Sequence, residues 1–342
     1  MRAHLLLMLT LVLAAGLSHG ATANRKTDII TFYNGDKITG EVKNLYAGLL
    51  EFSTDAMGTL KVEWQEIAKL ESLYNYEVRL TEGKRYYGKI DKSTRPGEIT
   101  VSDVYGEHKV SNLEIAEIRP VAISFTDRID IYLALGYSYT KASSLGQATF
   151  NTDISYEDEK SRNALTARLN ITDTDDDTTR SSKLDLSRQV WTNRQDVYRF
   201  SSGSYETNDE LALDYRFSVG GGLGKYFTDS FKSSWTGEIG AQALTEKSIG
   251  GDTQESVEGI LSTEYSTWKF DSPELNIKFG ISVYPSFTES GRVRADSDLS
   301  FRWEIVTDLF WDITAFGIYD NKAADSDAQF DYGITTGLGW EY

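Results

Sequence analysis

The segment FDYGITTGLGWEY, residues 330–342, alternates strictly between two kinds of side chain. In an extended strand, one face carries Phe330, Tyr332, Ile334, Thr336, Leu338, Trp340 and Tyr342. The other face carries Asp331, Gly333, Thr335, Gly337, Gly339 and Glu341. An apolar stripe that ends in two aromatic rings suits a strand that faces lipid and meets water at the membrane surface. The segment therefore predicts the last strand of a closed transmembrane β-barrel, in which no sheet edge remains to be covered.

The same alternation of apolar and polar residues continues upstream to about Arg128. Each run is close to the length that crosses a bilayer at a tilt, and about twelve runs can be counted. They start near Arg128, Ala148, Ser161, Ser182, Val197, Leu213, Phe231, Ser256, Glu274, Asp296, Leu309 and Ala328. Longer connections such as 172–180 alternate with tight ones such as 157–160, as in outer-membrane barrels. We therefore expect an all-β fold with a transmembrane antiparallel barrel over residues 125–342.

The alternation also predicts which charged side chains face the inside of the barrel. On the lipid face, a basic residue at mid-bilayer would cost about 2–4 kcal/mol, so charged positions should point into a polar lumen. The residues expected there are Asp185, Arg188, Arg216, Glu238, Glu264, Arg302 and Glu304. They could form ion-pair ladders that fill the barrel, or they could line a narrow water-filled pathway.

Residues 1–121 have a different organisation. A basic start, an apolar run and small residues near Ala23 predict a secretory signal peptide over residues 1–23. Two short β-rich units follow, in which Gly35 matches Gly83 and Gly40 matches Gly88 at a spacing of 48 residues. Their short strands and turn pairs predict two small SH3-like β-barrel repeats in the periplasm, over 24–73 and 74–121.

The composition excludes several classes of function. The chain has no cysteine, so we expect neither a disulfide framework nor a thiolate metal site. A net charge of -17 argues against nucleic acid as a partner, because binding phosphates needs basic patches. There is no histidine after His108, which excludes a serine–histidine enzyme within the barrel. We expect a protein that is not an enzyme and needs no cofactor or metal.

Clustered acidic residues offer one alternative to that expectation. Asp173, Asp175, Asp176 and Asp177 could attract calcium, which prefers carboxylate oxygens. The run lacks the glycine of an EF-hand loop, and Leu184 stands where that loop would end in glutamate. The sequence therefore favours a solvated outside loop that attracts divalent cations near lipopolysaccharide phosphates.

Two resemblances extend these predictions. Thr335, Gly337, Trp340 and Tyr342 resemble the C-terminal signal that the outer-membrane barrel assembly machinery reads: a polar residue, a glycine two positions later, then two aromatics. The segments LALGYSYT (133–140), SVGGGLGKYF (218–227), ISVYPSF (281–287) and GLGWEY (337–342) resemble the family of salt-induced outer-membrane proteins, Gram-negative β-barrels mostly of unknown function. This resemblance implies a location and a fold, and it supplies no catalytic residues.

The leading interpretation is a non-enzymatic, porin-like protein of the cell outer membrane with an N-terminal domain in the periplasm. It would act in envelope structure or in the osmotic response to salt, as a small channel that prefers cations because acidic charge surrounds its mouth. One alternative is a module that binds peptidoglycan or a periplasmic partner and is tethered by a barrel. The other is a barrel enzyme that acts on lipid or on an envelope polymer through carboxylates. Lipid, lipopolysaccharide and the assembly machinery are the expected partners.

Overall fold

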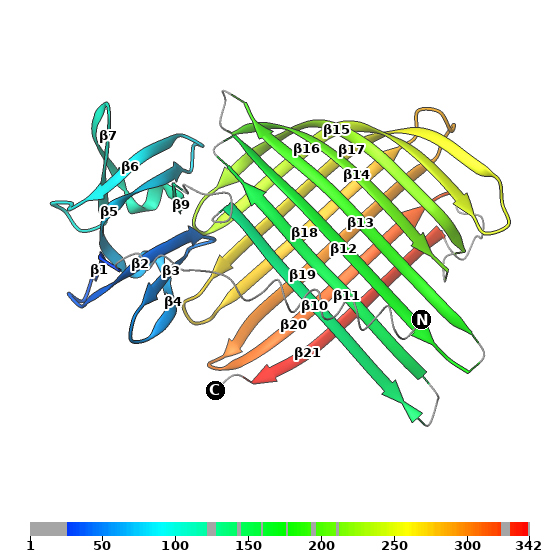
Figure 1. The fold of residues 1–342 in the computed structure, drawn as a ribbon, viewed down its shortest axis with the longest axis horizontal. Coiled ribbons are helices and arrows are strands. Elements are labelled where there is room, and N and C mark those ends of the chain that lie inside the picture. The colour runs from blue at the N-terminus through cyan, green and yellow to red at the C-terminus, as the bar shows by residue number, and fades with distance from the viewer. Residues whose placement is uncertain are drawn as a thin grey trace, which may run out of the picture.

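The computed structural model describes residues 26–121, 128–141, 145–158, 160–175, 177–192, 196–209, 212–322 and 329–340. These residues form two parts, a compact N-terminal module over 26–121 and a long antiparallel sheet that begins at Ile129 (Figure 1). The predicted signal peptide and Tyr342 lie outside the described residues. Among the described residues, no helix is long and apolar enough to cross a membrane.

The module is a nine-stranded sheet with the order β4-β3-β2-β1-β5-β6-β7-β8, in which β9 pairs with β5 and β2. Two short 3-10 helices precede β5 and β9. The elements are β1 (Asp28–Phe32), β2 (Lys37–Tyr46), β3 (Leu49–Thr54), β4 (Gly58–Glu63), η1 (Trp64–Glu66), β5 (Ile67–Leu80), β6 (Arg85–Asp91), β7 (Glu98–Asp103), β8 (Gly106–Ser111), η2 (Asn112–Glu114) and β9 (Ile115–Pro120).

The internal duplication appears as a repeated pairing pattern. Phe32 pairs with Ile67 between β1 and β5, and Leu80 pairs with Ile115 between β5 and β9, so the second pair lies 48 residues after the first. The boundary expected between residues 73 and 74 falls inside β5, which runs unbroken from one repeat into the other. The two repeats therefore share a strand instead of being joined by a linker.

The module has one hydrophobic core to which both repeats contribute. Its fully buried side chains include Phe52 and Leu70 from the first repeat and Ile99 and Ile118 from the second. The indole of Trp64 donates a hydrogen bond across this core to the carbonyl of Asn112, its equivalent 48 residues later, at 2.8 Å. Burial of one shared core binds the repeats into a single folding unit.

The second part is a twelve-stranded antiparallel sheet in which each strand pairs with its neighbour in the chain. It curls into an incomplete cylinder, called the barrel below (Figure 1). The all-β class and the expected strand number are confirmed. The strands are β10 (Ile129–Thr140), β11 (Leu145–Glu157), β12 (Ser161–Asp173), β13 (Thr178–Trp191), β14 (Val197–Asn208), β15 (Leu213–Asp229), β16 (Ser233–Ser248), β17 (Thr253–Lys269), β18 (Leu275–Pro285), β19 (Val293–Val306), β20 (Leu309–Asp320) and β21 (Phe330–Trp340).

The connections differ in length less than the sequence suggested. The run 172–180 is mostly strand, because β12 continues to Asp173 and β13 begins at Thr178. Likewise β16 extends to Ser248 and β17 begins at Thr253, so only residues 249–252 connect these two strands. The threonine-rich, polar residues of these segments extend the ladders, since threonine favours strands even where neither face is apolar.

The barrel has a seam between its first and last strands. Among the described residues, β10 is paired only with β11, and β21 only with β20. The expected closure of the last strand against the first is therefore absent from the described pairing. The polar faces of these two strands carry small residues such as Gly136 and Gly337 together with Tyr132 and Asp331.

Candidate functional site: the charged interior of the barrel

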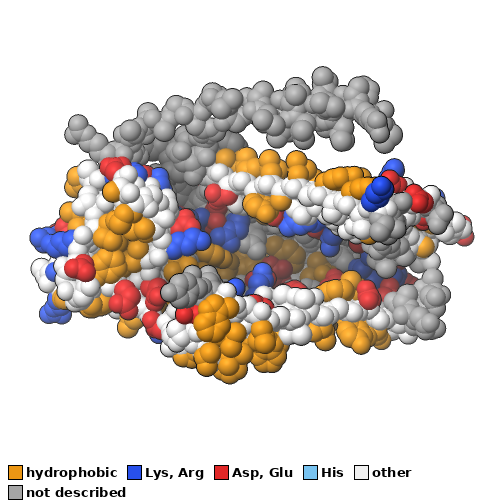
Figure 2. Space-filling view, turned by 90° about the horizontal axis from the view of Figure 1, so that it is seen from below, with side chains coloured by type: hydrophobic (Ala, Val, Ile, Leu, Met, Phe, Trp, Pro, Cys, Tyr) orange, Lys and Arg blue, Asp and Glu red, His pale blue; other side chains and the backbone are white. Residues whose placement is uncertain are grey.

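The two faces of the barrel are distinguished by register and by exposure. One face presents large apolar side chains to the outside, among them Leu135, Val219 and Leu338. The opposite face, called the inner face, can be followed across eight strands by cross-strand partners: Asp130, Ser155, Ala164, Ser187, Ser202, Gly220, Gln242 and Glu258. Figure 2 shows hydrophobic side chains on the outer surfaces of the sheet and charged ones between its two layers.

The end of the barrel away from the module, called the far end, contains a chain of ion pairs. Arg216 on β15 contacts Glu206 on β14 at 3.4 Å and Glu246 on β16 at 3.0 Å. Arg292, just before β19, contacts the same Glu246 and also Asp320 on β20, both at 2.7 Å. Because this chain joins strands that are not neighbours in the sheet, its side chains must cross the interior rather than follow one ladder.

A second buried pair lies beside that chain. Glu258 on β17 is completely buried, and Arg294 on β19 binds both of its carboxylate oxygens, at 3.0 and 2.7 Å. The amide of Gln242 donates a further hydrogen bond to Glu258 at 2.8 Å. The planar guanidinium of Arg294 also lies over the ring of Tyr284. Such a bidentate, fully partnered pair is the geometry in which a buried carboxylate is best stabilised.

Four of the predicted interior residues lie on the inner face but not in one group. Asp185 accepts a weak hydrogen bond from Thr166 at 3.4 Å, and Arg216 belongs to the far-end chain. Glu238 accepts a hydrogen bond from the buried hydroxyl of Tyr198 at 2.8 Å. Glu264 lies 3.5 Å from Lys278, and both are largely exposed to the lumen. The structure therefore distributes these charges along the barrel.

Arg302 and Glu304 lie on the inner face of β19 near the module. Arg302 stacks its guanidinium over Phe310 and approaches Asp312 at 4.0 Å. Glu304 accepts hydrogen bonds from the backbone N–H groups of Glu274 at 2.9 Å and Asp308 at 3.0 Å. Its carboxylate thus caps two turns instead of lining open space.

Arg188 is the exception among the predicted interior residues. It pairs across the sheet with Ser201 and Asn163, and it shares its face with the exposed Leu184 and Leu186. The prediction that Arg188 points inward together with Asp185 is therefore wrong, because residues three apart in a strand lie on opposite faces. Arg188 lies near the module end of β13, where a long side chain can reach water from an apolar face.

The residues of the expected assembly signal lie at the end of β21. Thr335 pairs with Thr314 and Gly337 with Asp312, both on the inner face, while Trp340 lies on the outer face opposite Leu309. Tyr342 is outside the described residues. Trp340 is 65 % exposed, so its ring is available to a partner or to lipid.

The most connected residues of the interior, Arg292, Arg294, Glu246 and Glu258, were not predicted from sequence. Glu246, Arg292 and Arg294 lie in segments expected to be outside loops, whereas Glu258 lies inside the run expected to start near Ser256. The alternation alone places Glu258 on the inner face, and continuing it past the expected strand ends does the same for Glu246 and Arg294.

Three glycines on the inner face of β15 have a packing role. A side chain at Gly224 would overlap the ring of Tyr198, and one at Gly222 would overlap the carbonyl oxygen of Ile239. Gly220 meets Gln242 in the same way. The glycines thus leave room for bulky neighbours and for close approach of the backbones.

The module is joined to the other end of the barrel, called the near end, by ion pairs that are buried or half-buried. Arg79 on β5 pairs with Glu117 on β9 and with Asp229 at the end of β15. Arg119 of the module and Arg162 of the barrel both contact Glu157 at 2.7 Å. Burial raises the pKa of the Glu117 carboxyl, but Arg79 and Arg119 outweigh burial and hold that pKa below its usual value.

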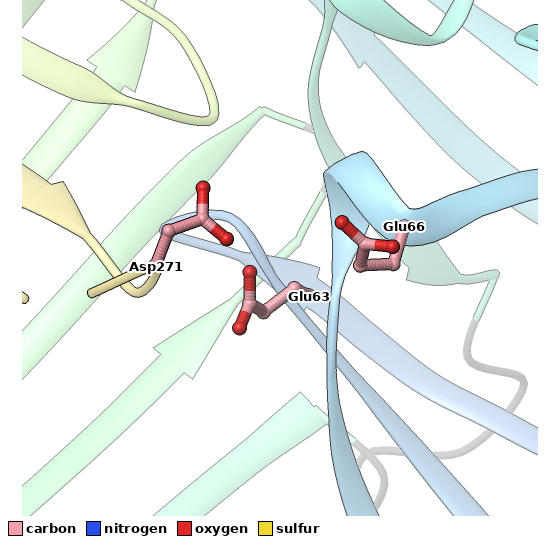
Figure 3. A group of neighbouring side chains, drawn as sticks. All are labelled: Glu63, Glu66 and Asp271. Atoms are coloured by element: carbon pink, nitrogen blue, oxygen red, sulfur yellow. The ribbon is translucent and has the colours of Figure 1, made fainter.

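Three carboxylates also meet where the module touches the barrel. Glu63 and Glu66 of the module and Asp271 in the β17–β18 turn lie within 4.8 Å of one another (Figure 3). Burial, together with the charges of Asp271 and Glu66, raises the pKa of Glu63, although Gln65 opposes this by donating a hydrogen bond to it. The group is largely exposed, and Gln65 also bonds Asp271 at 2.6 Å, so a bridging amide accounts for part of the clustering.

The acidic run of the β12–β13 connection forms a local turn. Thr178 donates a hydrogen bond to Asp173 at 2.6 Å, and the N–H of Asp177 bonds Thr174. Asp173, Asp175 and Asp177 are exposed, and Asp176 lies outside the described residues. The hydrogen bonds of the β12–β13 connection are thus those of an exposed turn.

Comparison with known proteins identifies one family. The family model described as "Protein of unknown function, DUF481" matches residues 133–342, which covers β11 to β21 and most of β10. No curated protein and no solved structure matches the chain.

Proposed function

This chain belongs to the DUF481 family of proteins of unknown function, and from that premise we propose that it is a non-enzymatic outer-membrane β-barrel protein. The observation that carries the proposal is the division of the twelve-stranded sheet into an apolar exposed face and a polar inner face. In water, exposed leucines, tryptophans and tyrosines in such number would promote aggregation, whereas in a bilayer they meet hydrocarbon.

The inner face supports a role in the passage of small cations. Its charges are arranged along the barrel, with the pairs of Arg216, Glu246 and Arg292 crossing the far end. An ion path through this interior would have to pass these crossing pairs at the far end and would meet the exposed Glu264 and Lys278 farther along the barrel. The net charge of -17 favours cations over anions at the mouths. A cation path of this kind fits a role in the response of the envelope to salt.

The paired state of the interior acids supports a non-enzymatic role. Glu258 is held by Arg294 and Gln242, and Glu238 is bonded by Tyr198. A general acid or base must reach its substrate, and carboxylates committed to such partners are poorly placed for it. Thr335, Gly337 and Trp340 support delivery of the barrel by the assembly machinery, with lipid and lipopolysaccharide around it.

Two measurements test this proposal. The protein should appear in the outer-membrane fraction and should migrate faster on a detergent gel before boiling than after it, because closed barrels resist detergent until heated. In planar bilayers the purified protein should give cation-selective conductance steps. Recovery of the native chain as a free periplasmic protein would refute the location. A correctly inserted protein that stays electrically silent at all voltages would leave a structural role and refute the cation path.

A second candidate function is binding of an envelope polymer by the module. Val104 and Tyr105, at the tip of the β7–β8 hairpin, are 93 % and 91 % exposed. Nearby, Tyr86 stacks on His108 with ring centroids 4.3 Å apart. The exposed ring of Tyr105, with the half-buried Tyr86–His108 stack nearby, suits contact with the sugar rings of peptidoglycan. If the module binds in this way, the full-length protein should sediment with purified sacculi and the Tyr105→Ala variant should not.

A further inference from the structure

A cavity of about 670 Å³ lies between the module and the near end of the barrel. The module contributes Tyr46, Glu51 and Lys61 to its wall. The barrel contributes Asp130, Ser155 and Glu157. The cavity therefore belongs to neither part alone, and it exists only while the module is docked.

The barrel residues that line this cavity are inner-face residues. Asp130 pairs with Ser155, and both belong to the cross-strand series that defines the inner face. Glu157 is two residues beyond Ser155 on the same strand and pairs with Arg162, so it lies on the same face. The barrel side of the cavity is therefore formed by the same face of the sheet that lines the barrel interior. The exposed charges of the interior lie farther along that face.

The module is held over this cavity at several separate points. Arg119 reaches Glu157 at the β11–β12 turn, and Arg79 reaches Asp229 at the β15–β16 turn. The guanidinium of Arg85 lies over the ring of Trp191 at the end of β13. Contacts with three successive barrel hairpins fix the orientation of the module as well as its position.

The β2–β3 turn of the module and the neighbouring Gln65 also contact the barrel. The β2–β3 turn presses so tightly against the barrel that a side chain at Gly48 would overlap the carbonyl oxygen of Phe231. Next to it, the amide of Gln65 bonds Asp271 in the β17–β18 turn at 2.6 Å. Contacts of this density, which include the ion pairs Arg79–Asp229 and Arg119–Glu157, are those of a fixed interface rather than of a domain on a loose tether.

We propose that the module is a permanent roof over the near end of the barrel, and that the cavity beneath it is the mouth through which the interior opens at that end. Ions that pass through the barrel would meet Lys61 and Glu51 of the module before leaving. The statement about ions rests on the proposed function, whereas the statement about docking does not.

Docking can be tested by cross-linking, because the chain has no cysteine of its own. In the full-length protein, the double variant Gln65→Cys and Asp271→Cys should react with a short bifunctional thiol reagent to give an intramolecular cross-link in nearly every molecule. The control, Gln65→Cys with Asp252→Cys in the far-end β16–β17 turn, should give none. If both thiols of the first variant are labelled by a monofunctional reagent and yet fail to cross-link, the roof is refuted.

The ion path can be tested separately by placing charge in the cavity wall. In the Lys61→Cys variant, a sulfonate-bearing thiol reagent should shift the reversal potential in a salt gradient toward greater cation selectivity, and an ammonium-bearing reagent should shift it the other way. Tyr105→Cys, on the exposed hairpin of the module, should respond to neither. An unchanged reversal potential in fully labelled Lys61→Cys channels would refute the proposal that the cavity is the mouth of the ion path.

The two tests separate the two ideas. If the wild-type protein is electrically silent but the two introduced thiols of the Gln65→Cys, Asp271→Cys variant cross-link, the proposed cation path fails while the roof stands. If the wild type conducts and the cross-link does not form, the roof fails while the path stands.

Discussion

At the scale of single residues, the module depends on a buried carboxylate that is completely enclosed. Asp28 has no exposed surface, and it accepts hydrogen bonds from the N–H of Val42 at 2.8 Å, from the hydroxyl of Ser72, and from the hydroxyl of Tyr76 at 2.9 Å. Burial, with the charge of Asp28 adding to it, raises the pKa of Tyr76, so its hydroxyl remains a donor at any physiological pH.

The Tyr76→Phe substitution should destabilise the module by about 1–3 kcal/mol, the cost of leaving a buried acceptor without its donor. Faster hydrogen exchange of β1 and β5 peptides in the full-length protein would report the loss. Tyr105→Phe removes a hydroxyl from an exposed ring and should leave exchange unchanged. Equal exchange in Tyr76→Phe and wild type would show that Asp28 does not need this donor.

The junction should weaken in acid because of Glu117. A carboxyl whose pKa is lower in the folded protein contributes stability that is present above its ordinary pKa of 4.5 and is lost as the pH falls through the folded value. Protease cleavage between module and barrel should therefore increase below pH 4.5 in the wild type. Glu77, whose pKa burial raises, contributes with the opposite sign and partly offsets the trend.

The Glu117→Gln variant identifies the source of that pH dependence. It should be less stable than wild type at neutral pH, because Arg79 and Arg119 lose a partner, and its cleavage should depend less on pH. If its acid profile matched that of the wild type, another group would be responsible.

At the scale of elements, the strands could be predicted because the outer face of each strand is largely apolar and the inner face largely polar, which gives an alternating sequence. Register errors arose where the sequence offered two equivalent choices, as at Asp185 and Arg188, which cannot share a face. The far-end pairs of Arg292 could not be predicted, because they join residues from β16 and β20 that only the curvature of the sheet brings together.

The Gly222→Ala substitution tests the close packing of β15 against β16. The added carbon would overlap the carbonyl oxygen of Ile239, so the backbones must separate, at a cost of about 1–3 kcal/mol. The temperature at which the compact gel form is lost should fall. Gly339→Ala on the inner face of β21 is the matched control, since the nearest atom to a side chain there is the Oδ2 of Asp312, at an ordinary contact distance of 3.8 Å. Similar losses in both variants would mean that any inner-face glycine is needed, whatever its neighbours.

At the scale of the whole molecule, the proposed membrane environment depends on which face of the sheet meets hydrocarbon. Leu135 is 69 % exposed on the outer face of β10, and Ala134 beside it lies on the inner face. The Leu135→Arg substitution should reduce the yield of folding into liposomes, costing about 2–4 kcal/mol at mid-bilayer. The Ala134→Arg variant should fold with nearly wild-type yield. Equal yields from the two variants would contradict the assignment of the faces.

Among the described residues, the outer edges of β10 and β21 are unpaired, so the completeness of the cylinder depends on its solvent. In water, each free N–H and C=O along the seam can bind a water molecule. In hydrocarbon no such partner exists, and each unmet group costs several kcal/mol. The two strands run in opposite directions, because every step between them is antiparallel. Their backbone N–H and C=O groups can therefore pair with one another in an antiparallel ladder. On the proposed membrane location, transfer from water to lipid would supply a driving force for pairing β10 with β21, and the bilayer would complete the wall that encloses the polar interior.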